Sequence, residues 1–277
     1  MINRDIKFSV SMCVYGKDNP LWFETAVESV INQTVRASEI VLVVDGPVPD
    51  ELDSIIKKYE AVTEFKVIRF EENQGHGNAR RAGLKAATYE IVALMDADDI
   101  CIPERFEKQL EIFANDPTVD IVGGNISEFI GNPENIVAKR EVPSDDAEIK
   151  EYMKKRCPMN QMTVMFKKSS VEQVGGYLDW YCDEDYYLWI RMAIANMKFA
   201  NMPDTLVYVR VGEQMYQRRG GRKYFRSEAK LQKYMLKHKI ISFGTYTVNV
   251  TKRFIVQRLL PNKIRGWVFK KFARKKV

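Results

Sequence analysis

The chain has 277 residues, of which 45% are hydrophobic and 29% charged, as in globular proteins with a sizeable core. Its longest apolar runs fall short of the roughly 20 residues that span a bilayer. Its first residues lack the apolar core of a signal peptide. Four cysteines without a CxxC pair are typical of free thiols in a reducing cytosol. We therefore expect a cytoplasmic protein without a membrane-spanning helix.

The net charge of +6 is unevenly distributed along the chain. Residues 214–277 hold 19 of the 43 Lys/Arg and one of the 37 Asp/Glu, so this part carries +18 and residues 1–213 carry −12. An acidic body with a basic tail indicates that the tail meets an anionic surface. We expect a body of residues 1–213 and a basic helical C-terminal extension of residues 214–277.

The first half of the chain alternates between strand and helix patterns. Large apolar residues that alternate with smaller ones predict a strand over 8–14, and further strands are predicted over 40–44, 65–70 and 90–95. Apolar residues at helical spacing predict helices over 23–31, 49–61 and 77–87. Strands separated by helices predict an α/β fold with a parallel sheet covered on both faces. Ligands bind such sheets at the carboxyl ends of the strands, so Tyr15, Asp45 and Asn73 should line one crevice with the acidic residues that follow position 95.

The second half has a less regular pattern. It predicts a strand over 119–130, a helix over 144–155 capped by Ser144, a strand over 163–166, a helix over 183–196, and basic helices from about Arg222 to the end.

Three carboxylates follow the buried strand that ends at residue 95. Asp96, Asp98 and Asp99 repel one another, and a bound divalent cation would relieve that repulsion. Residues i and i+2 of an extended chain point the same way, so Asp96 and Asp98 can reach one ligand. Carboxylate oxygens suit magnesium or manganese. The alternatives are a solvated acidic turn or a cap for the helix after Pro103.

Several motifs stand in one order along the chain. They are SVSMCVY at 9–15, AVESVINQT at 26–34, VVDG at 43–46, NQGHGNAR at 73–80, the acidic cluster, GGY at 175–177 and EDYYLWIR at 184–191. Over residues 8–210 this ordered set resembles the family 2 glycosyltransferases. The first strand departs slightly from the family pattern, because it ends in Cys13-Val14-Tyr15-Gly16 where Pro-Thr/Val-Tyr-Asn is usual.

The resemblance implies a fold and a reaction. The fold is the glycosyltransferase A fold, with a Rossmann-like, mostly parallel central sheet flanked by helices. Its nucleotide-binding half would be residues 1–99 and its acceptor-binding half residues 100–213. The reaction is the metal-dependent transfer of a sugar, with inversion, from a nucleotide-sugar donor to an acceptor hydroxyl.

The resemblance also implies a donor site for a nucleotide sugar, with a UDP-sugar favoured and manganese or magnesium as cofactor. Asp98 is the first choice of metal ligand, with Asp96 reaching the ribose or assisting at the metal. The expected nucleotide contacts are Val14, Tyr15, Asp45, Asn73, Gly75, Arg80, Asp96 and Ala97. From the residues alone, Asp45 could instead belong to a simple turn, and Arg80 could form a surface ion pair.

For the acceptor side, the resemblance implies that Asp185 is the general base and that Glu184 assists it. The alternative is that the acids at 183–185 only complement a helix dipole. We also expect acceptor or diphosphate contacts from four residues, namely Trp180, Asp183, Arg218 and Arg219. Core packing for Trp180 and an exposed basic loop for the two arginines are the competing interpretations.

The last 26 residues, Lys252–Val277, contain ten Lys/Arg and no acid. Ile264, Trp267, Val268 and Phe272 share one helical face, which is typical of a helix lying on an anionic membrane. The alternative is a helix packed on the catalytic domain. We expect a peripheral enzyme on the inner face of the cytoplasmic membrane. Together with the basic tail, the family resemblance implies a glycan acceptor linked to a polyprenyl diphosphate, in O-antigen or capsule biosynthesis.

Two other functions are weaker interpretations. A sugar-nucleotide nucleotidyltransferase would need a glycine-rich phosphate loop after the first strand, and none is present near Tyr15. A nucleic-acid-binding protein would use the basic tail, but the body carries −12 and shows no binding motif, so we expect no nucleic-acid partner.

Overall fold

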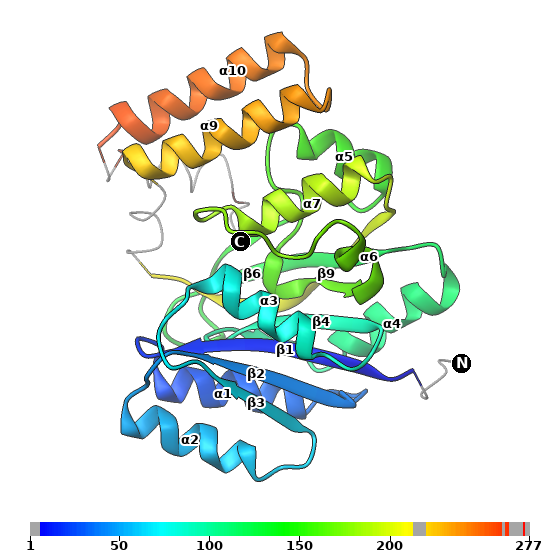
Figure 1. Ribbon diagram of the computed structural model, residues 1–277, viewed down its shortest axis with the longest axis vertical. Helices are drawn as coiled ribbons and strands as arrows, with labels where there is room; N and C mark the ends of the chain where they lie inside the picture. Colours follow the sequence, from blue (N-terminus) through cyan, green and yellow to red (C-terminus); the bar gives the residue numbers. More distant parts are fainter. Residues whose placement is uncertain (1–5, 213–219, 262–263, 266–273, 275–277) are drawn as a thin grey trace.

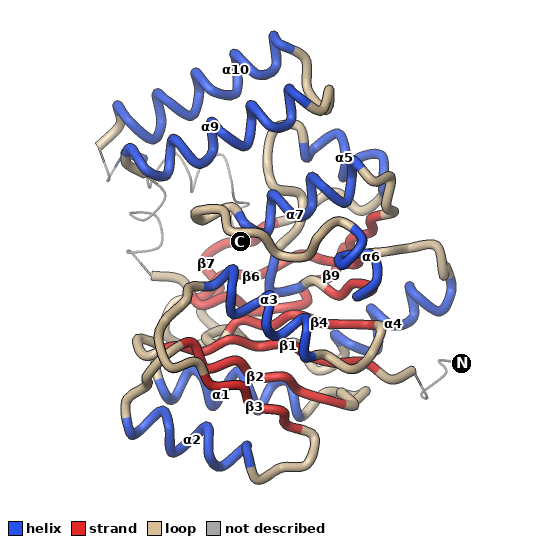
Figure 2. Tube along the Cα trace, viewed as in Figure 1, coloured by secondary structure: helices blue, strands red, loops and turns tan. Residues whose placement is uncertain are grey.

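A mixed β-sheet runs through the centre of the molecule, with helices on both faces (Figures 1 and 2). The computed structural model describes residues 6–212, 220–261, 264, 265 and 274. Among these residues the strand order is β3-β2-β1-β4-β8-β6-β9-β5, and β7 pairs with β6.

The part of the fold from β1 to β4 forms as the sequence predicts. Its elements are β1 (Phe8–Tyr15), α1 (Pro20–Ile31), β2 (Glu39–Asp45), α2 (Asp50–Glu60), β3 (Phe65–Arg69), α3 (His76–Ala86) and β4 (Ile91–Asp96). β1 pairs in parallel with β2 and β4, and β2 pairs in parallel with β3. Alternate side chains of β2 pack on opposite faces: Leu42 joins the core under α1 and α2, whereas Val43 joins the core under α3. The β2 strand is therefore buried on both sides, as expected for a parallel sheet.

The part of the fold from β5 to β9 adds antiparallel pairing. Its elements are β5 (Ile100–Cys101), α4 (Arg105–Asn115), β6 (Ile121–Phe129), β7 (Ile136–Arg140), α5 (Asp146–Met153), the 3-10 turn η1 (Gln161–Thr163), β8 (Met165–Lys167), α6 (Lys168–Gln173), α7 (Glu184–Ile194) and β9 (Phe199–Arg210). β8 runs antiparallel to both β4 and β6, whereas β9 is parallel to β6. β8 thus joins the two halves into one sheet.

Two predictions of local structure were wrong in detail, and some strands were missed. The helix predicted over 144–155 is capped by Asp145, whose Oδ1 accepts a hydrogen bond from Glu148 N at 2.9 Å, and not by Ser144. The strand predicted over 163–166 begins only at Met165, because Thr163 still belongs to η1. The strands β5, β7 and β9 were not predicted.

The described part of the C-terminal extension is a helical pair. It contains α9 (Arg222–Lys237), α10 (Phe243–Phe254) and the π-helical turn η2 (Ile255–Leu259). The helical prediction for this region is therefore interrupted at 238–242, where Ser242 caps α10 by accepting a hydrogen bond from Thr245 N at 3.1 Å. The pair lies beside α5 and α7 (Figure 1). No helix in the described ranges is both long and apolar enough to cross a membrane.

Candidate active site

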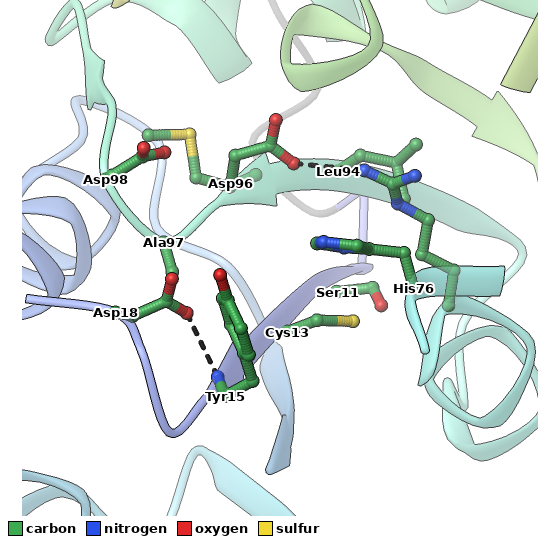
Figure 3. A pocket seen from close by; sticks show the side chains of 11 residues that line it. Ser11, Cys13, Tyr15, Asp18, His76, Leu94, Asp96, Ala97 and Asp98 are labelled. Atoms are coloured by element: carbon green, nitrogen blue, oxygen red, sulfur yellow. Dashed lines mark hydrogen bonds and ion pairs between the residues drawn. The ribbon is translucent and has the colours of Figure 1, made fainter. Parts of the chain in front are cut away.

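A cavity of about 220 Å³ opens at the carboxyl ends of β1 and β4 (Figure 3). Its lining comes from β1, the turn after it, α3, β4 and the acidic turn, and consists of Ser11, Cys13, Tyr15, Asp18, His76, Arg80, Leu94, Met95, Asp96, Ala97 and Asp98. Four expected nucleotide contacts, Tyr15, Arg80, Asp96 and Ala97, therefore lie together with the expected metal ligand Asp98. This placement agrees with ligand binding at the carboxyl edge of a parallel sheet.

Three carboxylates face this cavity, one of which sequence reasoning missed. Asp18 follows β1, and its Oδ2 accepts a hydrogen bond from Tyr15 N at 3.0 Å (Figure 3). Burial raises the pKa of Asp18 to about 6, and the negative charges of Asp98 and Asp96 add to the rise. A bound cation would relieve this concentration of negative charge.

Asp99 has a different environment from its two neighbours. It is buried, and its Oδ1 accepts a hydrogen bond from Arg210 N at 2.9 Å. Burial and the charges of Asp98 and Asp96 raise its pKa well above the usual range. The Arg210 guanidinium lies between the rings of Trp22 and Phe129, and its Nε donates to Asp98 O at 3.3 Å. Arg210 thus holds the acidic turn against the end of β9, a role that the sequence did not indicate.

Asp45 acts on the loop that precedes α3. Its carboxylate accepts hydrogen bonds from Asn73 Nδ2 at 3.0 Å, Gln74 N at 2.7 Å and Gly75 N at 3.0 Å. Gly75 has a φ of 84°, a conformation that favours glycine. Asp45 is buried and does not line the cavity. In this structure Asp45 fixes the conformation of the loop that carries Asn73 and Gly75. A simple turn after β2 would not account for these contacts.

Arg80 joins the two halves of the site. Its Nη1 donates to Glu184 Oε1 at 2.6 Å, and its Nη2 lies 3.4 Å from Asp96 Oδ1. The Arg80 side chain is only 14% exposed, so this is not the surface ion pair that the sequence left open. The guanidinium connects the acidic turn to the start of α7, where the expected base lies.

The first turn of α7 carries the expected base and its neighbour Glu184. Asp185 Oδ1 accepts a hydrogen bond from Tyr186 N at 2.7 Å. Burial raises the pKa of Asp185 to about 6, and the negative charge of Glu184 adds to the rise, while Arg80 opposes it. With this raised pKa, the Asp185 carboxyl is mostly ionised at neutral pH. It is also a stronger proton acceptor than an exposed aspartate.

The remaining expected contacts differ in their surroundings. Trp180 is 9% exposed and lies between the Tyr187 ring, 4.2 Å away, and Lys230 Nζ, 4.3 Å from its own ring centre. Packing thus covers most of the indole, in line with the core-packing interpretation, and the acceptor contact of Trp180 stays a prediction. Val14 is also buried and pairs with Val44 of β2, and its nucleotide contact stays a prediction. Arg218 and Arg219 lie outside the described residues.

Comparison with known proteins gives the family. The model of "Glycosyl transferase family 2" matches residues 9–175, more than half of the chain. UDP-Gal:α-D-GlcNAc-diphosphoundecaprenol β-1,3-galactosyltransferase of Escherichia coli is 36% identical over 269 residues, which is 97% of each chain. An amylovoran biosynthesis glycosyltransferase of Erwinia amylovora is 35% identical over 264 residues, 95% of this chain and 98% of that one.

A solved structure matches the fold. A mannosyltransferase from Pyrobaculum calidifontis, in complex with GDP-Man and Mn2+, superposes with a TM-score of 0.58 at 15% identity, covering 96% of this chain and 74% of that one. The expected glycosyltransferase A fold is thereby confirmed. With the family match over residues 9–175 and two relatives of known reaction class aligned over nearly their full length, the chain belongs to the family 2 glycosyltransferases.

Proposed function

We propose that this glycosyltransferase moves a sugar, with inversion, from a UDP-sugar to a hydroxyl group of a lipid-linked glycan. The observation that carries the proposal is the pair of contacts that Arg80 makes with Asp96 and Glu184. It places the acidic cavity, suited to a metal-bound diphosphate, next to the turn of α7 that bears Asp185. Asp185 would accept the proton of the attacking hydroxyl, and Glu184 would keep Arg80 in place.

Two carboxylates of the cavity would bind a divalent cation together with the donor. Asp98 and Asp96 would hold manganese or magnesium, and the bound cation would stabilise the charge that develops on the leaving diphosphate. Within the described residues, no group of three or more His, Cys, Asp or Glu is placed to hold a metal ion alone. Donor phosphate oxygens would therefore complete the coordination. Asp96 would also reach the ribose.

The acceptor proposal rests on the two bacterial relatives. One transfers galactose to a sugar on diphosphoundecaprenol, and the other acts in amylovoran biosynthesis. We infer a polyprenyl-diphosphate-linked acceptor in a surface-polysaccharide pathway. Arg218 and Arg219, together with the buried Asp183 near the base, remain our candidates for contacts on the acceptor side.

The test is a donor screen with the purified protein. UDP-sugars would be offered with Mn2+ and a synthetic N-acetylglucosaminyl-diphosphate lipid as acceptor, and products identified by mass spectrometry and NMR. We expect one UDP-sugar to give a product with inverted anomeric configuration, and turnover to stop in EDTA. A retained configuration, or full turnover in EDTA, would contradict the proposal.

We further propose that the C-terminal helical pair docks on an anionic membrane. Val248, Ile255 and Leu259 are 50%, 45% and 61% exposed and share one face of α10 and η2 with Lys252 and Arg258. Apolar side chains set among cations suit the boundary of an anionic bilayer. Of the amphipathic set expected earlier, Ile264 is 48% exposed, while Trp267, Val268 and Phe272 lie outside the described residues.

Replacing both Ile255 and Leu259 by Glu should weaken binding to phosphatidylglycerol vesicles by at least about tenfold, because two exposed apolar side chains are lost and two anions added. Vesicle co-sedimentation measures the change. Val62→Glu is the matched control, since Val62 is also exposed but lies beyond α2. Equal binding by the double variant and the control would place the membrane contact elsewhere.

A further inference from the structure

Arg105, the first residue of α4, is 0% exposed, and an arginine is almost never buried so completely unless it is paired. Its Nε donates to Gln109 Oε1 at 3.0 Å, and its Nη2 donates to Leu94 O at 2.8 Å and to Val164 O at 3.4 Å. Its Nη1 donates to Cys101 Sγ at 3.1 Å. None of these acceptors is a carboxylate, so the buried charge gains hydrogen bonds here but no neutralising partner.

Two of these contacts lie on either side of the acidic turn, residues 96–99. Leu94 lies in β4, two residues before the turn, and Cys101 lies in β5, two residues after it. The guanidinium also contacts Met95 Sδ, directly before the turn, at 3.6 Å. One rigid, planar group thus contacts the chain where it enters the acidic turn and where it leaves it.

The sheet itself does not join these two ends. In the strand order, β8, β6 and β9 lie between β4 and β5. Hydrogen bonds between neighbouring strands therefore do not hold the β4 end of the acidic turn against its β5 end. Arg210, at the end of β9, fixes the middle of the turn through Asp98 O and Asp99 Oδ1. Arg105 adds the direct connection between the ends.

We propose that Arg105 is a positioning residue for cation binding: by tying β4 to β5, it fixes the placement of Asp96 and Asp98. This inference rests on the proposed function, in which these two carboxylates hold the cation. Small divalent cations need their ligands close to ideal geometry, so a loosened turn binds them less well. The positive charge of Arg105 acts in the opposite sense, because a buried cation repels a metal ion nearby. Position and charge therefore make opposite predictions for a neutral side chain at this site.

The test measures UDP binding by calorimetry in Mn2+ and in EDTA. Arg105→Met removes both the charge and the hydrogen bonds, and it should weaken Mn2+-dependent UDP binding by at least about tenfold, with little change in EDTA. Arg105→Lys keeps the charge but lacks the planar fork that reaches both ends of the turn, so it should also weaken binding in Mn2+. A role through charge alone would instead give wild-type binding by Arg105→Lys and tighter binding by Arg105→Met.

Arg191→Met is the matched control. Arg191 of α7 is also buried, at 7% exposure, and it also donates to backbone carbonyl groups, those of Val174 and Gly176. These acceptors lie between α6 and α7 and not beside the acidic turn. Arg191→Met should therefore lower the thermal stability, as Arg105→Met does, but bind UDP in Mn2+ like the wild type. Equal losses of UDP affinity in both variants would overturn the proposal.

Metal selectivity is a readout that lower stability alone does not move. Mg2+ requires nearly ideal octahedral geometry, whereas Ca2+ accepts a more flexible set of ligands. The preference for Mg2+ over Ca2+ in UDP binding should thus shrink in Arg105→Lys and persist in Arg191→Met. An unchanged preference in Arg105→Lys would reduce Arg105 to a residue that only stabilises the fold.

A second variant covers the case in which Arg105→Met does not fold. Cys101→Ala removes the contact at the β5 end alone and should also weaken Mn2+-dependent UDP binding, by less than Arg105→Lys does. Wild-type binding by both variants would overturn the proposal. Asp98→Ala separates this inference from the proposed function. A loss of Mn2+-dependent binding in Asp98→Ala but in no Arg105 variant would remove the inference alone, whereas binding by the wild type that does not depend on Mn2+ would remove both.

Discussion

Asp185→Asn is expected to lower kcat for sugar transfer by about 10³-fold while leaving donor affinity unchanged. The amide cannot accept the proton of the attacking hydroxyl, and general-base catalysis is typically worth 10²–10⁴-fold. The change is nearly isosteric, so Glu184 keeps its contact with Arg80, and Arg80 its contact with Asp96. Donor binding measured by calorimetry with UDP and Mn2+ should therefore match the wild type.

The pH dependence of kcat/KM gives a second measurement on the same residue. Because burial and Glu184 raise the pKa of Asp185 to about 6, the base is protonated below that pH and free above it. Activity of the wild type should thus rise with pH through about 6, and the residual activity of Asp185→Asn should not. Asp179→Asn is the matched control, because Asp179 is exposed and six residues upstream. Near-normal turnover of the Asp185→Asn variant would exclude Asp185 as the base.

The strands β2 and β4 were predictable because burial on both faces selects continuous apolar runs. The strand β9 was not, because Asn201, Pro203 and Asp204 give its first part the composition of a loop. It forms a strand through parallel pairing with β6, about 78 residues earlier, and the register shifts on either side of Asn125 accommodate the irregular segment. The partner strand β6 was predicted, but its pairing with this irregular part of β9 leaves no signal in the sequence of β9 itself.

The same distinction between local and distant partners applies to the site. The acidic turn was predictable because its three carboxylates are adjacent in sequence. The contact between Arg80 and Glu184 joins residues 104 positions apart, and Arg210 reaches the acidic turn from 111 positions away. Only the motif order indicated that Arg80 and Glu184 share a site, and nothing in the sequence indicated Arg210. Asp18 was missed because a single acid in a turn has an ordinary surface interpretation.

Within the acidic turn, we expect replacement of Asp98 and replacement of Asp96 to change different properties of donor binding. Asp98→Ala should weaken Mn2+-dependent UDP binding by about 100-fold, equivalent to about 2.8 kcal/mol, because the cation loses its main protein ligand. Binding measured in EDTA should change little. Asp50→Ala serves as the control, since Asp50 is an exposed aspartate at the start of α2. Unchanged calorimetry with Mn2+ would remove Asp98 from the metal site.

Asp96→Ala should mainly alter recognition of the ribose. Wild-type enzyme should prefer UDP to its 2′- and 3′-deoxy analogues by about tenfold or more for one hydroxyl, since a hydrogen bond to a charged group contributes about 1.5–3 kcal/mol. The Ala variant should bind UDP and that analogue equally. A variant that keeps this preference but loses the response to Mn2+ would make Asp96 a metal ligand only.

Because Asp96 also contacts Arg80, its replacement frees the guanidinium from one of its two carboxylates, so kcat should fall as well. Asp98→Ala leaves that contact in place, and the two variants thereby separate binding of the cation from coupling to α7.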